Sequence, residues 1–279
     1  MNGGRGAAPR HRELGTVRWP EVATRATTLV VPVGSCEQHG PHLPLDTDTR
    51  IASAVASGAV RLRGGAGENS GAGKSSGADW NGGADGNGGS DRTGADVLLA
   101  PAVAFGASGE HEMFPGTVSV GQDALRSVLV ELGRSAGRWS SRIVFVNGHG
   151  GNVGVLREAV DLLRAEGRDA RWWGCALPAD AGFVRDGHAG RTETSIMLAL
   201  APETVLLERA AAGNSAPLAE LLPAMRAGGV RAVSDNGVLG DPAGASAEEG
   251  RRMLEVMTAA CARAVGAEPA VCDPRASPK

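Results

Sequence analysis

Short apolar runs alternate with amphipathic segments along most of the chain. Residues 27–33, 96–106, 142–146 and 170–177 are rich in β-branched, aliphatic or aromatic side chains, which predicts buried strands. Between and after them, apolar residues recur at helical spacing and predict helices at about 49–63, 124–138, 152–166, 193–200 and 246–265. This alternation predicts an α/β fold with a mainly parallel sheet and helices on both faces.

Residues typical of helix caps locate the N-termini of three predicted helices. Asp123 and Asn152 each precede a periodic segment and are expected to cap it with a side-chain oxygen. Ser246 and Glu249 stand at capping-box spacing ahead of the last predicted helix.

One long segment breaks the pattern. Residues 64–94 consist mainly of Gly, Ser, Asn, Ala and Asp, with little besides Trp80 to bury. Such a composition predicts a disordered insertion. We therefore expect one catalytic domain over residues 14–267 that carries this insertion, between a flexible leader at 1–13 and a flexible tail at 268–279.

Composition narrows the classes of partner. The formal net charge of -3 gives no broad basic surface, so nucleic acid is not an expected ligand. No apolar stretch reaches the length of a membrane span, and the first residues lack the apolar core of a secretory signal. These two features lead us to expect a cytoplasmic protein. The cysteines are scattered and form no C-x-x-C pair, so we expect free thiols.

Three polar clusters fall at the carboxyl ends of predicted strands: EQHGPHLPLDTD, NGHGGN and DGHAGRTETS. Ligands of open α/β sheets bind beyond the carboxyl ends of the strands, so these clusters are expected to meet. In the first cluster Glu37 and His39 are two residues apart, which puts both side chains on one side of an extended segment. Asp48 closes the same loop and could bridge two cations.

The second and third clusters supply further candidates. His149 lies between glycines ahead of a predicted helix, where a ligand would be held rigidly. Mixed nitrogen and oxygen donors suit Zn, Fe or Mn. Two such metals about 3.5 to 4 Å apart would polarise a carbonyl and lower the pKa of water. His188 or Glu193 could then shuttle a proton to the leaving nitrogen, and Glu193 could equally complete the second metal site.

Less specific readings stand beside these. His42 and His111 could orient ligands or line the pocket, but a structural role fits them as well. Glu110 and Glu112 are most simply interpreted as a solvated loop. Cys36 beside Glu37 could be a catalytic thiolate, although that reading leaves the converging carboxylates unexplained.

Four segments in order resemble the creatininase family: VPVGSCEQHGPHLPLDTDTRIA, SGEHEMFPGTVS, FVNGHGGN and HAGRTETSIMLAL. The resemblance covers residues 16–207 and implies a three-layer α/β/α sandwich around a dinuclear metal centre. It also implies hydrolysis of cyclic or linear amides, usually by a homo-oligomer.

Carried over by motif, the resemblance places Glu37, Asp48 and His149 on one divalent metal, and His39 with the shared Asp48 on the other. Zn or Fe is the expected metal, with Mn as a further option. Creatininase has a metal-binding Glu two residues after the His of its Asn-Gly-His motif, where this chain has Gly151. Glu193 is our candidate for the missing ligand, and His188 would assist as acid, base or oxyanion partner.

Within the family, the runs LPLDTDTRIA and WWGCALPADAGFVRDGHAGRTETS look most like the mycofactocin-system members. That resemblance implies a peptidase that releases the C-terminal Val-Tyr dipeptide from the modified mycofactocin precursor peptide. The alternatives are a creatinine or formamide amidohydrolase with the same metal centre, and a non-catalytic member that binds partners through its glycine-rich insertion.

Overall fold

A computed structural model describes residues 13–22, 27–65, 96–178 and 180–266. The predicted leader, insertion and tail lie almost wholly outside these ranges, so their flexibility stays a prediction. Within the described part, the strands are β1 Thr27–Val33, β2 Asp96–Leu99, β3 Arg142–Asn147 and β4 Ala170–Gly174. The helices are α1 Trp19–Val22, α2 Thr47–Gly65, α3 Gly121–Ala136, α4 Val153–Ala165, α5 Arg191–Leu200, α6 Leu218–Gly228 and α7 Ala247–Gly266.

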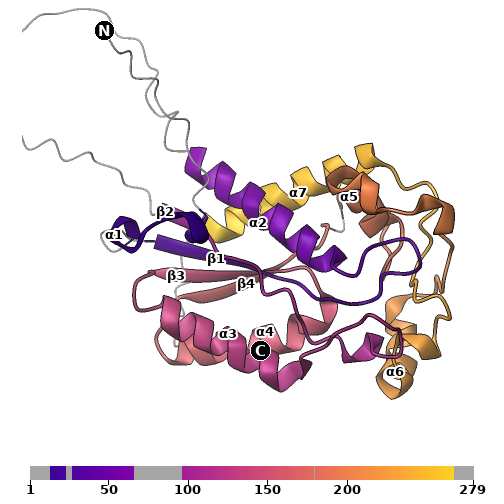
Figure 1. Cartoon of the computed structure of the whole chain (residues 1–279), viewed down its shortest axis with the longest axis horizontal. Coiled ribbons are helices and arrows are strands. Elements are labelled where there is room, and N and C mark those ends of the chain that lie inside the picture. The colour runs from indigo at the N-terminus through magenta and orange to yellow at the C-terminus, as the bar shows by residue number, and fades with distance from the viewer. Residues whose placement is uncertain (1–12, 23–26, 66–95, 179, 267–279) are drawn as a thin grey trace, which may run out of the picture.

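The described strands form one parallel sheet in the order β2-β1-β3-β4 (Figure 1). β1 and β3 are central, and they are paired from Thr28↔Arg142 to Val33↔Asn147. The chain moves to one side of β1 to form β2, and then crosses to the other side to form β3 and β4. The crevice beyond β1 and β3 is therefore the topological switch point at which ligands of such sheets bind.

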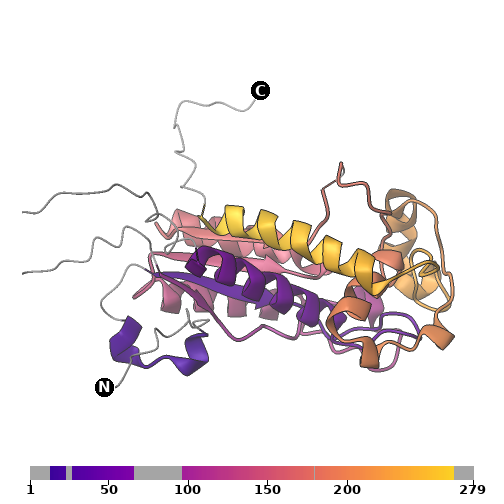
Figure 2. The same cartoon turned by 90° about the horizontal axis from the view of Figure 1, so that it is seen from above.

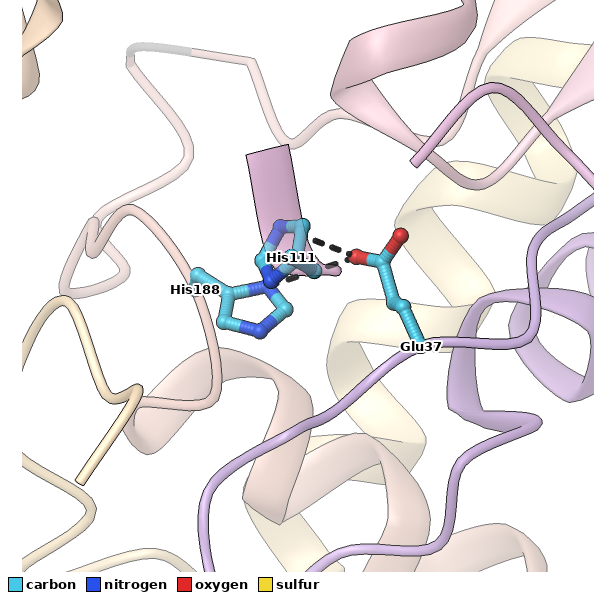
Figure 3. A group of neighbouring side chains, drawn as sticks. All are labelled: Glu37, His111 and His188. Carbon is cyan, nitrogen blue, oxygen red and sulfur yellow. Dashed lines mark ion pairs between the residues drawn. The ribbon is translucent and has the colours of Figure 1, made fainter. Parts of the chain in front are cut away.

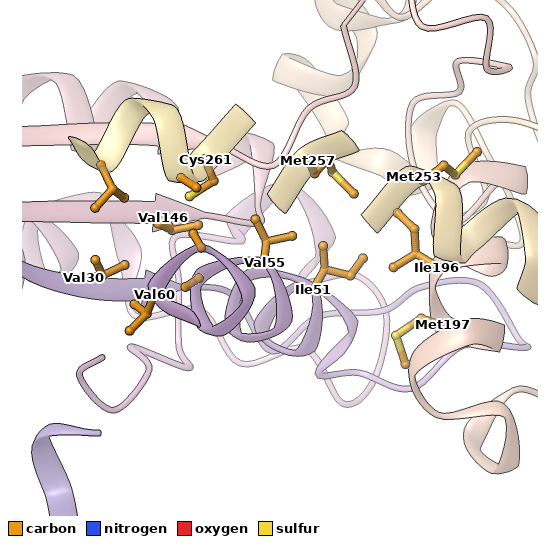
Figure 4. Packing of buried hydrophobic residues seen from close by; sticks show 14 of the residues in the cluster. Val30, Ile51, Val55, Val60, Val146, Ile196, Met197, Met253, Met257 and Cys261 are labelled. Carbon is orange, nitrogen blue, oxygen red and sulfur yellow. The ribbon is translucent and has the colours of Figure 1, made fainter. Parts of the chain in front are cut away.

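Helices cover both faces of the sheet and make a three-layer sandwich, which confirms the predicted fold class. On one face Val30, Val144 and Val146 pack against α2, α5 and α7 (Figure 4). On the other face Leu29, Val31 and Phe145 pack against α3 and α4. Seen from above, α2 and α7 lie side by side across the sheet (Figure 2).

Two expected strands end earlier than predicted, for identifiable reasons. β2 stops at Leu99, just before Pro101, whose nitrogen carries no hydrogen for a ladder bond. Beyond Leu99, an isolated bridge from Val103 to Val33 continues that line. β4 stops at Gly174 because its partner strand ends there, with Asn147 paired to Gly174.

The predicted caps at Asp123 and Asn152 are wrong. α3 begins at Gly121, so Asp123 lies inside its first turn, and the Asn152 side chain makes no capping bond to α4. The capping box is half formed: the Ser246 hydroxyl accepts the Glu249 N–H at 3.2 Å. The Glu249 carboxylate instead accepts hydrogen bonds from Arg191 and Ser195.

No helix in the described part of the chain is long and apolar enough to cross a membrane.

Candidate metal centre

The Asn152 side chain ties together the loops that leave three strands. Its Oδ1 accepts the Ala107 N–H at 2.9 Å, and its Nδ2 donates to the Gly34 carbonyl at 3.0 Å and to Asn147 Oδ1 at 3.2 Å. These buried bonds use the polar atoms that the sequence had suggested for capping. The loops after β1, β2 and β3 are therefore held at fixed positions around the crevice.

Close backbone approach also fixes the loop after β3. A Cβ at Gly148 would overlap the Asp48 carbonyl oxygen, so only glycine lets the NGHGGN loop come this near to the start of α2. As a result His149 and Asp48, 101 positions apart in the printed sequence, share one site.

Glu37, His39, Asp48 and His149 all converge in this crevice, as the sequence predicts. His149 Nδ1 lies 3.2 Å from Glu37 Oε1 and 3.2 Å from Asp48 Oδ2. Asp48 Oδ1 lies 3.2 Å from His39 Nε2. All four side chains are buried, with at most 4% of any residue exposed.

Asp48 stands between two imidazoles and is anchored from behind. The Ser35 hydroxyl donates to its Oδ2 at 2.6 Å, and one carboxylate oxygen faces each imidazole. Burial by itself would raise the pKa of Asp48, but the charges and hydrogen bonds of His39 and His149 hold it well below its ordinary range. The carboxylate is therefore ionised and presents an oxygen to either side.

Glu37 is wholly buried, with imidazole rings beside its carboxylate. Neither of its oxygens has a hydrogen bond of good geometry within the described residues, although nitrogens of His149, His111 and His188 lie 3.2, 3.3 and 3.8 Å from Oε1. Burial would raise its pKa, but His149 and His111 lower the pKa to about 2. An ionised buried carboxylate without hydrogen bonds is costly unless a cation compensates it.

His39 is oriented as a ligand would be. Its Nδ1 lies 3.1 Å from the Glu37 carbonyl and donates to it, so Nε2 faces Asp48 and Glu193. Burial would lower its pKa, yet the surrounding carboxylates raise the pKa to about 10. The same negative charges that hold a proton on this ring favour a metal cation in its place.

Glu193 and His188 complete the cluster. Glu193 Oε2 lies 4.0 Å from His39 Nε2 and accepts the Ala189 N–H at 2.6 Å, and burial raises the Glu193 pKa to about 7. His188 Nε2 donates to the Gln38 carbonyl at 2.8 Å, so Nδ1 faces Glu37 at 3.8 Å. Burial, with the charges of His39 and His111, lowers the His188 pKa to about 3.

His111 belongs to the site, although the sequence left its role open. Its Nε2 lies 3.3 Å from Glu37 Oε1, and Glu37 faces both His111 and His188 (Figure 3). The Gln38 amide donates to His111 Nδ1 at 2.8 Å, which puts the ring proton on Nε2, toward Glu37. Only its position beside Glu110 in the SGEHEM segment could have signalled this role.

Three other sequence readings can now be judged. Glu110 is not simply a solvated loop residue, because its Oε1 lies 3.5 Å from His149 Nε2; Glu112 is exposed as expected. Burial and nearby carboxylates raise the pKa of the Cys36 thiol, which argues against a catalytic thiolate. His42 is buried and bonds Thr194 at 2.9 Å, beside the cluster.

The donor set fits divalent cations. In the described part of the chain, three trios have ligand atoms within 4.8 Å of one another: Glu37, His39 and Asp48; His39, His188 and Glu193; and Glu37, His111 and His188. Imidazole nitrogens and carboxylate oxygens together suit Zn, Fe or Mn better than Ca or Mg.

Comparisons with known proteins agree with this geometry. The family model described as creatinine amidohydrolase (creatininase) matches residues 15–265, well beyond the segment that carries the motifs. A protein of Mycolicibacterium smegmatis named "Mycofactocin precursor peptide peptidase" is 52% identical over 249 residues, which cover 89% of this chain and 88% of that protein. The "Creatinine amidohydrolase" of Pseudomonas putida is 27% identical over 286 residues, covering 91% and 96%.

A solved structure described as "Creatininase Mn" superposes with a TM-score of 0.70 at 25% identity, covering 92% of this chain and 98% of that one. The family model spans nearly the whole described fold, and a relative is identical to this chain at more than half of the aligned positions. The chain belongs to the creatininase family of metal-dependent hydrolases.

Proposed function

We propose that the protein is a metal-dependent peptidase that releases the C-terminal Val-Tyr dipeptide from the modified mycofactocin precursor peptide. The observation that carries the proposal is the 52% identity to a protein of that name, against 27% to a creatinine amidohydrolase. The buried cluster supports the chemistry, because it gathers ligands and proton-transfer groups in one crevice.

Two metal positions would use five side chains of the cluster. Glu37, Asp48 and His149 would hold one divalent cation, and His39, Asp48 and Glu193 the other. The short distances from Asp48 to both imidazoles support the shared role of this carboxylate. Bound cations would polarise the scissile carbonyl and lower the pKa of the attacking water.

The chain's own residues would supply the proton transfers. In the alternative role, in which Glu193 does not bind a cation, burial raises the pKa of its carboxyl to about 7, so it can exchange a proton near neutral pH and protonate the leaving nitrogen. His188 is neutral and turns an unprotonated Nδ1 toward the cluster, so it can accept a hydrogen bond there, while its pKa of about 3 makes it a weak base.

Dipeptide release tests the proposal directly. The purified protein, loaded separately with Fe, Zn or Mn, is incubated with the modified precursor peptide, and the products are separated and identified by mass spectrometry. We expect Val-Tyr and the shortened peptide with at least one metal. Intact peptide with every metal, from protein that does bind metal, would contradict the proposed substrate.

Creatinine or formamide hydrolysis is the second candidate. It is favoured by the description of the matching family model and by the relative from Pseudomonas putida. The same metal-loaded protein is offered creatinine and simple formamides beside the peptide. Turnover of a small amide at a kcat/KM above that of the peptide would favour this candidate.

One variant separates the two roles considered for Glu193. Glu193→Gln keeps the shape of the side chain but cannot exchange a proton, and an amide oxygen is a poorer ligand. If Glu193 acts as a ligand, we expect the second metal equivalent to be lost. If it acts only as a proton donor, both metals stay bound and the rate falls.

We also retain two predictions about the whole molecule, a homo-oligomeric state and a cytoplasmic location. Light scattering coupled to size-exclusion chromatography tests the first, and fractionation of cells that express the chain tests the second.

A further inference from the structure

A second carboxylate stands on the outer side of His149. Glu110 lies in a single 3-10 turn, Gly109–His111, and its side chain is 29% exposed. His149 turns Nδ1 inward to Glu37 and Asp48, and Nε2 outward to Glu110 Oε1 at 3.5 Å. The Ala107 carbonyl at 3.3 Å and the Ser108 hydroxyl at 3.5 Å also contact Nε2 on this outer side.

Gly151 makes room for this carboxylate. A Cβ at position 151 would overlap both Glu110 Oε1 and His149 Nε2, and would lie 2.7 Å from the Ala107 carbonyl oxygen. The φ angle of Gly151 is not in the left-handed region, so conformational freedom does not explain the glycine. What requires it is the space that Glu110 and His149 occupy together.

We propose that Glu110 is a positioning residue for His149: it accepts a hydrogen bond from Nε2–H and so keeps Nδ1 aimed at the metal position between Glu37 and Asp48, and Gly151 admits it to that place. The inference rests on the metal centre of the proposed function. A histidine ligand commonly donates its second ring N–H to a carboxylate or carbonyl, which fixes the ring and its tautomer. Here Glu110 and the Ala107 carbonyl play those parts.

The direction in which the pKa of Glu110 is shifted agrees with this role. Burial would raise its pKa, but the hydrogen bond and charge of His149 outweigh that effect and lower the pKa. Glu112, two residues on, is exposed and offers a matched control in the same loop. A carboxylate there shares the local backbone and charge but not the contact with His149.

The test compares four variants with the native protein: Glu110→Ala, Glu110→Gln, Gly151→Ala and Glu112→Gln. Each metal-free protein is titrated with Co²⁺ alone, and the calorimetric affinities and visible d–d absorption are recorded. We expect Glu110→Ala to weaken one of two Co²⁺ equivalents by about 10- to 100-fold and to alter its absorption band, because the ring of one ligand is released. The other equivalent should bind as in the native protein.

The remaining variants grade the effect. Glu110→Gln should fall between the native protein and Glu110→Ala, since its amide oxygen still accepts a hydrogen bond. Gly151→Ala should resemble Glu110→Ala, because the added methyl group displaces the carboxylate. Glu112→Gln should bind both equivalents normally.

The outcomes are distinguishable from failure of the proposed function. If the native protein binds no Co²⁺, the metal centre itself is wrong. If it binds two equivalents and Glu110→Ala binds both with native affinity and spectrum, the positioning role is overturned, even when the variant melts at a lower temperature. Should Glu110→Ala fail to fold, Glu110→Gln decides the matter: native affinity and an unchanged spectrum would overturn the role.

Discussion

Along β1 and β3 the buried side chains are nearly all apolar and pack against helices, whereas the loops that leave the same two strands bury carboxylates and imidazoles. The first region is a layer of buried aliphatic side chains that pack against one another, among them Val30, Val144 and Val146. A few residues further along, Glu37 and His149 are as deeply buried but face one another's charge. The first region stabilises the fold. The second holds buried carboxylates and imidazoles, whose desolvation opposes folding, in place for the proposed metal binding.

This contrast explains why the site can be so deeply buried. An ion pair of imidazole and carboxylate inside a protein is weak evidence for stability, because the desolvation of both groups opposes their attraction. Asn152 and Gly148 fix the loops at the edge of the sheet and so hold these groups in place. Substitutions in the two regions should therefore affect different properties.

The largest effect is expected from Asp48→Asn at the edge of the sheet. The amide can no longer serve two cations, so dipeptide release should fall by more than about 100-fold and bound metal should decrease. Mass spectrometry of products and elemental analysis measure both. Asp46→Asn is the control, because Asp46 lies in the same loop but pairs with Arg50 at the surface. Equal loss in both variants would mean that loop structure, rather than ligation, is responsible.

Leu125→Ala, in contrast, should lower the stability of the fold and leave metal binding unchanged. Leu125 is fully buried in the layer between α3 and the sheet. Removing its side chain should lower the free energy of unfolding by about 2 to 5 kcal/mol. Denaturant unfolding gives that value, and metal content per folded molecule should stay native. A variant that also loses metal would show that the core and the edge are coupled.

Metal removal should reveal how much the buried charges depend on cations. Metal bound only to the folded state stabilises it by roughly 2.7 kcal/mol when free metal is 100 times Kd. We expect protein treated with a chelator to melt at a lower temperature and to recover when Zn, Fe or Mn is restored. Mg²⁺, which prefers oxygen ligands, is the control and should give little recovery. Identical melting with and without bound metal would argue that the cluster is neutralised by protons alone.

Ser35→Ala should give the smallest effect of the series. The hydroxyl of Ser35 donates to Asp48 from behind, and its loss frees the carboxylate to turn. Metal affinity should fall by about 10-fold, the low end of the range for groups that support ligands. Isothermal titration calorimetry measures the affinity. Ser57→Ala on α2 is the control, since the Ser57 hydroxyl accepts a hydrogen bond from Arg61 at the surface. An equal fall in the metal affinity of Ser57→Ala would contradict the role expected for Ser35.

Much of the fold could be predicted because its signals are local. Residues 27–33 form β1 as expected, and α2, α4 and α7 lie within a few residues of their predicted bounds. α6 was not predicted, and Pro223 inside it weakens any helical signal in that segment. The convergence of the side chains of residues 37, 39, 48 and 149 could also be predicted, since strand ends in a parallel sheet share one edge.

What the sequence did not predict depends on contacts between distant loops. Asn152 looked like a cap because its position before a helix is local, whereas its partners Ala107 and Gly34 are far away in the chain. Glu110 looked solvated because nothing in its own segment indicates that Gly151 leaves space beside it. Such approaches are set by packing of the whole sandwich.

Anomalous X-ray diffraction from crystals of the protein loaded with Mn or Zn would test the central claim most directly. We predict two peaks that share Asp48, one beside Glu37 and His149 and the other beside His39 and Glu193. A metal-replete crystal with no peak within coordination distance of Asp48 would contradict the account.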